Sequence, residues 1–283
     1  MNVRRGEASS VSCEKMNIVV CVKAVPASTE VKMDPRTNTI VRDGAAAVVN
    51  PFDAAALEAA LQLADERAAQ NAEGETRVSV LSMGIPATES LLSDCIARGA
   101  TDALLLSDRA FAGADTLATT YALTCGLQTL GDTPDLVMCG KMAVDGDTAQ
   151  IGPEIAGALD VPCVTDVREI VSCADGVLTV RCGTDEGTAT MEVALPAVIT
   201  VSKDIAQLRM PTIAGVRAGE AAQVRVLDAA AADADTSRCG LVGSPTQVLR
   251  SFVPERATGA VDVAGDVPQQ ANELLQIIEG MGL

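Results

Sequence analysis

Residues 135–153 read Asp-Leu-Val-Met-Cys-Gly-Lys-Met-Ala-Val-Asp-Gly-Asp-Thr-Ala-Gln-Ile-Gly-Pro, and this stretch decides the fold. Its apolar first part, which ends at Cys139, predicts a buried strand, and a helix is expected from about Thr148 to Leu159. A strand that runs through a glycine-containing loop into a helix is the repeating unit of α/β proteins with a parallel sheet.

The same unit recurs on the N-terminal side of this stretch. Strands are expected at 17–22, 78–81 and 103–106, and helices at 54–69, 86–98 and 116–129. Asp53 is expected to cap the first helix, and Gly99 to end the second. Four alternations of strand and helix predict a doubly wound, mostly parallel sheet that is covered on both faces.

The pattern changes on the C-terminal side. Residues 166–193 predict an appended β-hairpin, and residues 196–201 predict a strand that returns to the main sheet. Residues 203–217 are expected to form an irregular loop, residues 229–235 a flexible connector, and residues 267–281 a helix. The expected organisation is a disordered N-terminal extension at 1–15, an α/β domain at 16–228, and a linker with an extended C-terminal arm at 229–283.

The composition excludes several classes of function. The 283 residues include 21 basic and 38 acidic side chains, and the formal charge of -17 disfavours nucleic acid and anionic membranes as partners. The chain has no histidine, and its nine cysteines lack the two-residue spacing of metal knuckles, so hydrolytic triads and metal sites have no support. No apolar run reaches the roughly 20 residues that insertion into a membrane needs. Reduced cysteines that serve as small core residues indicate a cytoplasmic protein.

Ligands of such sheets bind beyond the carboxyl ends of the strands, where the strand order reverses. Four loops are therefore candidates, and they begin at Lys23, Ser82, Ser107 and Gly140. The loop from Gly140 to Pro153 is the best anion site, because its glycines allow close approach and a helix N-terminus attracts phosphate. A turn that merely caps the helix is the alternative.

Scarce cations and a second turn add to this site. Only five lysines occur, and Lys23 and Lys141 both follow predicted neighbouring strands, where their charge would offset a diphosphate. Solvated surface lysines are the alternative. Residues 111–120 form another flexible turn before a helix and are candidates for a second phosphate. No segment matches the GxGxxG or P-loop pattern, so ordinary dehydrogenases and ATPases lose their main support.

Five motifs together resemble the electron-transfer flavoprotein beta subunit family. They read MNIVVCVKAVP at 16–26, VNPFD at 49–53, DGDTAQIGP at 145–153, LPAVIT at 195–200 and GSPT at 243–246. The resemblance implies an adenine-nucleotide alpha-hydrolase-like fold and a heterodimer with an alpha subunit that carries FAD. The beta subunit of this family supplies a second nucleotide site. That site holds AMP in ordinary members and a second FAD, which accepts hydride from NADH, in electron-bifurcating members.

The residue at position 146 favours FAD over AMP. Ordinary members tend to read Asp-Asp-Asp here, whereas this chain reads Asp145-Gly146-Asp147, similar to the FAD-holding type. Glycine opens main-chain approach and removes a charge that would repel a pyrophosphate. The resemblance thus implies electron bifurcation from NADH to the alpha-subunit FAD and to a low-potential acceptor, ferredoxin or flavodoxin. A subunit with structural AMP that docks dehydrogenases, and a stand-alone adenine-nucleotide-binding protein, are the alternatives.

The resemblance also assigns residues. The expected nucleotide contacts are Cys21, Lys23, Asn50, Ser82, Met83, Gly84, Asp115, Thr116, Thr119, Gly140, Lys141, Ala143, Asp145, Gly146, Asp147, Thr148, Ala149 and Gln150. Residues 203–217 resemble the family's recognition loop, in which Ile205 or Leu208, with Arg209, is expected to meet an acyl-CoA-type or other flavin dehydrogenase. An ordinary mobile loop is the alternative, because the family's common Asn-Glu-Pro-Arg-Tyr sequence is not kept. The C-terminal arm is expected to pack on the alpha subunit.

Overall fold

The structure is a computed structural model that describes residues 15–27, 47–70, 75–131, 133–249 and 262–281. Apart from Lys15, the N-terminal extension expected at 1–15 lies outside the described residues. The main compact unit extends as far as Gln247, and a second unit contains the C-terminal residues from Val248 onward.

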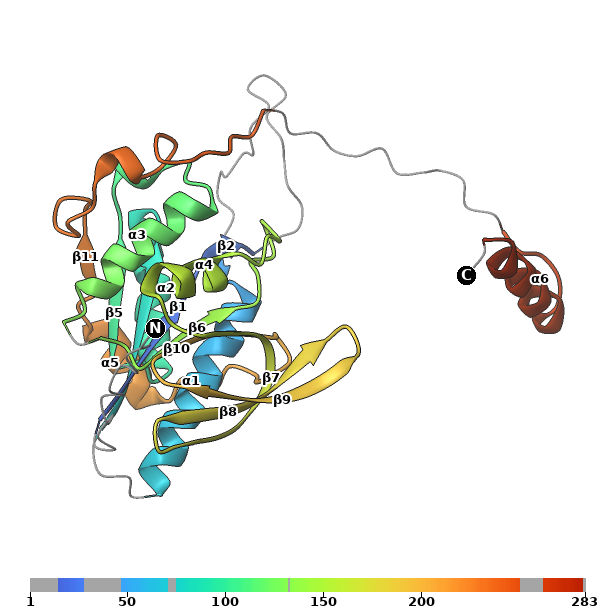
Figure 1. The fold of residues 1–283 in the computed structure, drawn as a ribbon, viewed down its shortest axis with the longest axis horizontal. Helices are drawn as coiled ribbons and strands as arrows, with labels where there is room; N and C mark the ends of the chain where they lie inside the picture. The colour runs from blue at the N-terminus through green and yellow to red at the C-terminus, as the bar shows by residue number, and fades with distance from the viewer. Residues whose placement is uncertain (1–14, 28–46, 71–74, 132, 250–261, 282–283) are drawn as a thin grey trace, which may run out of the picture. The chain divides into compact units, whose positions relative to one another are not determined.

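A nine-stranded sheet forms the centre of the main unit (Figure 1). Its strand order is β11-β5-β4-β1-β6-β10-β7-β8-β9. Neighbours from β11 to β7 are parallel, and β7, β8 and β9 are antiparallel. The strands are β1 (Met16–Cys21), β4 (Thr76–Met83), β5 (Asp102–Leu106), β6 (Leu136–Gly140), β7 (Cys163–Ala174), β8 (Val177–Thr184), β9 (Gly187–Ala194), β10 (Ala197–Val201) and β11 (Arg225–Leu227). A separate antiparallel pair joins β2 (Ala24–Pro26) to β3 (Ala47–Val49).

Helices cover both faces of the sheet, which confirms the doubly wound α/β fold. Ile18 and Val20 of β1 lie in one core with residues of α1 and α2, whereas Val19 and Cys21 lie in the other with residues of α3 and α4. Successive residues of a strand point to opposite faces, so β1 is buried on both. The helices are α1 (Pro51–Ala69), α2 (Glu89–Ala97), α3 (Thr116–Gln128), α4 (Ile151–Leu159) and α5 (Ile213–Ala221), with short 3-10 turns η1 (Pro86–Thr88), η2 (Arg109–Phe111) and η3 (Thr236–Arg238).

Helix starts differ from the sequence prediction at two places. α1 begins at Pro51 with Asn50 as its N-cap, so the prediction of Asp53 as the cap is wrong. Proline suits the first helical position because its fixed φ matches the helix and the missing N–H would be unpaired there. α4 begins at Ile151 rather than Thr148, which leaves residues 147–150 outside the helix.

Three C-terminal predictions also change. The appended hairpin is a three-stranded extension, because β7 pairs with β10 on one side and β8 on the other. The loop predicted at 203–217 contains the start of α5, where Thr212 caps the amide of Gly215. The connector predicted at 229–235 is packed, with Ala229 and Ala232 buried in the second core, because its alanines supply apolar surface.

The second unit contains the described helix α6 (Val267–Gly280), which confirms the helix predicted at 267–281. Asp266 and Gln269 form a capping box at its start. Leu274, Leu275 and Ile278 are exposed along the helix. Of the helices in the described ranges, none combines the length and apolar character that crossing a bilayer requires.

Candidate functional site

The strand order reverses between β1 and β6. From β1 the chain passes to β4 and β5 on one side, and it returns to β6 on the other side of β1. Cys21 lies opposite Cys139 in the register of these two strands, so both strands end at the same level. Ligands of doubly wound proteins bind at such a reversal, beyond the carboxyl ends of the strands.

The loops that follow β1 and β6 meet at this point. The Lys23 ammonium lies 2.6 Å from Oδ1 of Asp145, and the two side chains are 48% and 35% exposed. An ion pair this exposed contributes little to stability, so the ammonium is available to a competing anion. The structure therefore brings together the end of the first strand and the loop that the sequence singled out.

The loop after β6 is open to solvent. All seven residues from Val144 to Gln150 are exposed, and a Cβ added at Gly146 would find Lys23 Nζ, at 4.0 Å, as its nearest neighbour. Asp147 and Ala149 have φ angles of 52° and 54°, in the left-handed region that disfavours side chains. Such strain clusters where a backbone is shaped for a ligand, and the open space beside an ammonium suits an anionic group.

Asp53 lies buried beneath these loops. Its Oδ2 accepts the Lys23 amide at 2.8 Å, and its Oδ1 accepts the Gly140 amide at 3.0 Å. Burial raises the pKa of this carboxyl to about 7, although the hydrogen bonds from Lys23, Asn50 and Gly140 oppose the shift. The sequence analysis missed this role, because the only local signal is an acidic residue in the first turn of a helix.

Asn50 is also buried, with none of its surface exposed. Its Nδ2 donates to the Met142 carbonyl at 2.8 Å, and its Oδ1 accepts the Val144 amide at 3.1 Å. Both atoms of the side-chain amide are thus engaged with the loop. A direct contact of Asn50 with a nucleotide stays a prediction.

The end of β4 carries an unpaired polar group. Ser82 is 1% exposed, and its hydroxyl has no hydrogen-bond partner among the described residues. Buried hydroxyls are normally paired, so a polar ligand atom or water would satisfy this one. Met83 and Gly84, which follow Ser82, are half-buried, and Cys21 on the adjacent strand is buried.

The start of α3 is joined to the start of α4. Thr116 and Thr120 donate their hydroxyls to the two carboxylate oxygens of Glu154, at 3.1 and 2.9 Å. The Asp115 carboxylate caps α3 through the Ala118 amide and accepts the amide and hydroxyl of Thr246. Hydrogen bonding to these groups lowers the pKa of Asp115 against the opposing effect of burial. Asp115 is therefore already engaged within the chain, and Thr119 lies half-buried in the first turn of α3.

Residues 243–246 and Glu154 form part of the site, although their local sequence gives no sign of these contacts. Ser244 is buried and its hydroxyl accepts the Asp115 amide at 2.8 Å, so this motif closes over the start of α3. The local sequence Gly-Ser-Pro-Thr does not predict this contact with Asp115, which lies 129 residues away in the chain. The Lys141 ammonium lies 3.2 Å from Asp166 of β7, with which it forms an ion pair.

Two of the three predicted partner-binding residues are half-buried apolar side chains. Ile205 and Leu208 pack against the first core, and Arg209 forms an ion pair with Glu58 of α1. The most exposed large apolar side chains of this segment are Met210 and Ile213, at 81% and 79%. The role of Ile205, Leu208 and Arg209 in partner binding stays a prediction.

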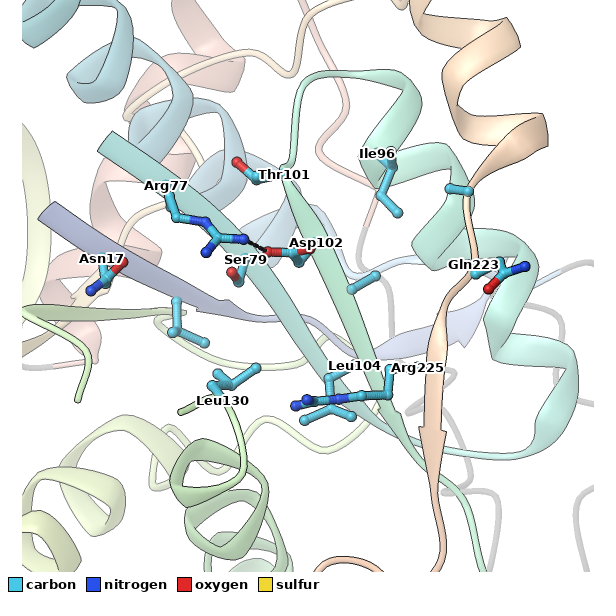
Figure 2. A pocket seen from close by; sticks show the side chains of 13 residues that line it. Asn17, Arg77, Ser79, Ile96, Thr101, Asp102, Leu104, Leu130, Gln223 and Arg225 are labelled. Carbon is cyan, nitrogen blue, oxygen red and sulfur yellow. Dashed lines mark hydrogen bonds and ion pairs between the residues drawn. The ribbon is translucent and has the colours of Figure 1, made fainter. Parts of the chain in front are cut away.

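A cavity of about 420 Å³ lies at the opposite, amino ends of the strands (Figure 2). Arg77 and Arg225 line it, but Arg77 forms an ion pair with Asp102, and Arg225 donates to the Thr129 carbonyl at 2.9 Å. None of the predicted nucleotide contacts lines this cavity. The polar groups at the switch point, rather than this cavity, form the candidate site.

Comparison with known proteins gives a consistent picture. The family model described as "Electron transfer flavoprotein domain" matches residues 37–232. The chain is 43% identical to the electron transfer flavoprotein subunit beta of Megasphaera elsdenii over 251 residues, which cover 87% of this chain and 90% of the relative. It is 40% identical to the caffeyl-CoA reductase-Etf complex subunit CarD of Acetobacterium woodii, with 88% and 92% covered. It is 41% identical to protein FixA of Azorhizobium caulinodans, with 90% and 92% covered.

Proposed function

Since the chain belongs to the electron transfer flavoprotein beta subunit family, we propose that its switch point between β1 and β6 holds FAD. When bound, this FAD would take hydride from NADH and pass electrons to the FAD of an alpha subunit and to a low-potential acceptor, ferredoxin or flavodoxin. The protein's part is to bind and orient the cofactor. We also propose that the protein is cytoplasmic.

One observation carries the choice of FAD, namely the open space above Gly146. Among the described residues, an added Cβ would approach only the Lys23 ammonium, at 4.0 Å, and Asp145 already balances that charge. An acidic residue at 146 would place a second carboxylate beside Lys23 and repel a diphosphate. Glycine leaves both the ammonium and the loop amides to the ligand.

Residues of three strand ends fit the proposed cofactor. The amides of Asp145, Thr148 and Ala149 and the Lys23 ammonium would hold the diphosphate, because the amides of Gly146 and Asp147 already donate to the Ala143 carbonyl. A few amides and one local cation neutralise an anion without a basic surface. Thr148 and Gln150 offer a hydroxyl and an amide to ribose or adenine. The unpaired Ser82 hydroxyl offers a buried polar contact, and Cys21 and Met83 offer apolar walls.

The proposed partners follow from two surfaces. α6 exposes Leu274, Leu275 and Ile278, and we propose that this C-terminal arm packs on the alpha subunit. The segment 203–217 would dock an acyl-CoA-type or other flavin dehydrogenase. Exposed apolar side chains on an element of a separate unit are typical of surfaces that a partner covers.

The test is a count of cofactors. The chain is co-expressed with an alpha-type subunit, the purified heterodimer is denatured by heat, and released FAD and AMP are quantified. We expect two FAD per heterodimer. One FAD with one AMP would assign the chain to the AMP-holding members, and a stable monomer indifferent to the partner would indicate a stand-alone nucleotide-binding protein.

The variant Gly146→Asp tests the role of the open space. We expect it to lose most of the FAD bound by this subunit, because its carboxylate competes for Lys23 and repels the diphosphate. The control Gly157→Asp introduces the same charge on α4, where an added Cβ has no atom within 4 Å, and it should retain FAD. Equal FAD content in the two variants would contradict the proposed site.

A further inference from the structure

The turn from Asn50 to Asp53 makes more hydrogen bonds to the two loops of the site than any other segment we find there. The backbone amide of Asn50 donates to the Lys23 carbonyl at 2.8 Å, and the backbone amide of Lys23 donates to the Asp53 carboxylate at 2.8 Å. The backbone of Lys23 is therefore held on both of its polar sides. The end of β1 is fixed by the start of α1.

The same turn fixes the loop after β6. Asp53 accepts the Gly140 amide, and Asn50 holds the carbonyl of Met142 and the amide of Val144. The hydrogen-bonded residues are every second one, at positions 140, 142 and 144, and the loop is exposed from Val144 onward. The side-chain oxygen and nitrogen atoms of Asn50 and Asp53 thus make hydrogen bonds to the two loops.

Gly140 shows how closely the two parts are fitted. A Cβ at this position would lie 2.4 Å from Oδ1 of Asp53 and 2.5 Å from Cβ of Phe52. Real Cβ atoms do not approach other atoms so closely, so only glycine allows the strand end to reach the carboxylate. Glycine at position 140 is therefore required for the hydrogen bond between its backbone amide and Asp53.

We propose that Asn50 and Asp53 are the positioning residues of the nucleotide site: together they clamp the ends of β1 and β6 at the spacing that the diphosphate needs. This inference rests on the proposed function and deepens it. This positioning role is separate from the direct contact with the nucleotide that the resemblance predicts for Asn50. The effect of both residues reaches the nucleotide through Lys23, whose ammonium faces Gly146, and through the amides of the loop.

The clamp explains why a carboxyl is buried beneath the two loops. Desolvation disfavours the charged form of Asp53, and hydrogen bonds together with the charge of Lys23 offset only part of this effect. A group that is unfavourable to bury and yet joins two ligand-binding loops is typical of functional rather than structural placement. Precise placement of a site by buried hydrogen bonds is the usual way in which a site is preorganised.

The first test uses Asp53→Asn in the full chain after removal of nucleotide. Asparagine keeps one acceptor and turns an N–H toward the other amide donor, so one of the two strand-end contacts is lost. We expect the dissociation constant for FAD to rise about tenfold, as loss of one hydrogen bond implies. The thermal midpoint should stay within a few degrees, because the buried charge is lost as well. The control Asp160→Asn makes the same change at an exposed residue in the left-handed region that asparagine tolerates, and it should bind FAD normally.

Amide hydrogen exchange gives a second readout that does not need a ligand. In Asp53→Asn, exchange should accelerate at Lys23 or Gly140, while Val22 and Lys141 stay protected by their bonds to the Leu81 and Val201 carbonyls. Equal acceleration at all four amides would mean general loosening and would overturn the clamp. Unchanged protection and unchanged FAD affinity would overturn it as well.

The two proposals fail in different ways. If the wild-type chain takes up neither FAD nor AMP, the proposed function is wrong, but the exchange experiment still decides whether Asp53 joins the strand ends. If Asp53→Asn does not fold, Asn50→Ala removes the contacts to Met142 and Val144 and leaves the contacts of Asp53 to the Lys23 and Gly140 amides in place. That variant should weaken FAD binding and accelerate exchange at Val144, and wild-type behaviour in both measurements would overturn the clamp.

Discussion

Two opposing effects act on the protonation of the Asp53 carboxyl. Burial favours its neutral form, whereas the amides of Lys23 and Gly140 favour its charged form, and burial is the larger effect. The carboxyl accordingly has a pKa of about 7 in the folded chain against 3.8 in its ordinary state. The folded protein therefore binds more protons than the unfolded protein between these two values.

This difference predicts a pH dependence of stability. The contribution of Asp53 is fully present below about pH 4 and is lost as the pH rises through about 7, because the unfolded carboxyl ionises first. At about 1.4 kcal/mol per pKa unit, the loss is at most about 4 kcal/mol. Urea unfolding of the wild type and of Asp53→Asn from pH 4.5 to 8 should show the variant gaining stability relative to the wild type as pH rises. Parallel curves would contradict a raised pKa.

Ala149 is strained in its left-handed conformation, with a φ of 54°. We expect Ala149→Gly to raise the free energy of unfolding by about 0.5 kcal/mol, since relief of the strain exceeds the entropy of the added glycine. The matched change Ala158→Gly, on the exposed face of α4, should lower it by about 1 kcal/mol. Denaturant titration measures both, and the same sign in the two variants would argue against strain at 149.

The sequence located the loops of the site better than the roles of its residues. Glycines, lysines and polar residues after Cys21 and Cys139 are visible because ligand sites of parallel sheets follow strand ends. Asp53 was taken for a helix cap, because its two partners are 30 and 87 residues away in the chain. Contacts of this range leave no local pattern.

At the scale of elements, ion pairs of Arg209 with Glu58 and Asp65 hold the segment before α5 on α1. Arg209 makes hydrogen bonds to both carboxylate oxygens of Glu58, whose side chain is 5% exposed. The guanidinium of Arg98, the C-cap residue of α2, donates to the Arg209 carbonyl at 2.7 Å. The partner-docking segment that we propose is therefore fixed by two helices at its centre.

Loss of this arginine should be strongly destabilising. We expect Arg209→Met to lower the free energy of unfolding by about 3 kcal/mol, because Glu58 is left buried without its partner. The double variant Glu58→Gln with Arg209→Met should recover part of that loss. Arg181→Met, which breaks the exposed pair with Glu169, should change it by less than about 1 kcal/mol. Equal losses for Arg181→Met and Arg209→Met would show that burial is not the cause.

Elements in the core were predicted well, and those near the surface were not. The segment 103–106 is wholly apolar, and 196–201 is apolar except for Thr200; the structure has strands at 102–106 and 197–201. α5 was missed because its sequence contains two glycines, Gly215 and Gly219, which suggest a loop. An added Cβ at these positions would meet Ala97 and Ser93 of α2, so the glycines allow close packing of two helices.

At the scale of the whole molecule, the chain has two units of unequal size. The main unit contains the sheet and the candidate site, and the second contains α6, whose apolar residues are exposed. The division falls after Gln247 rather than at residue 229, because residues 229–247 pack on the main unit. The alternating pattern predicted the sheet, but an alanine-rich segment did not reveal which of its residues are buried.

Truncation after Gln247 tests the separate roles of the units. We expect the shortened chain to keep the thermal midpoint of the full chain, because the core is intact, and to lose association with an alpha-type subunit in size-exclusion chromatography. In the full chain, Leu274→Glu with Ile278→Glu should cause the same loss, whereas Glu273→Gln should not. Association that survives the truncation would mean that α6 is not the contact.

The position of β10 constrains how the protein can be made. β10 follows β9 in the chain but lies between β6 and β7, and all five of its residues are buried. A nascent chain that has not yet released residues 197–201 from the ribosome therefore exposes an unpaired apolar edge on β6. Such an edge is a template for wrong pairing with other chains. The two halves of the sheet therefore join only once β10 has been synthesised.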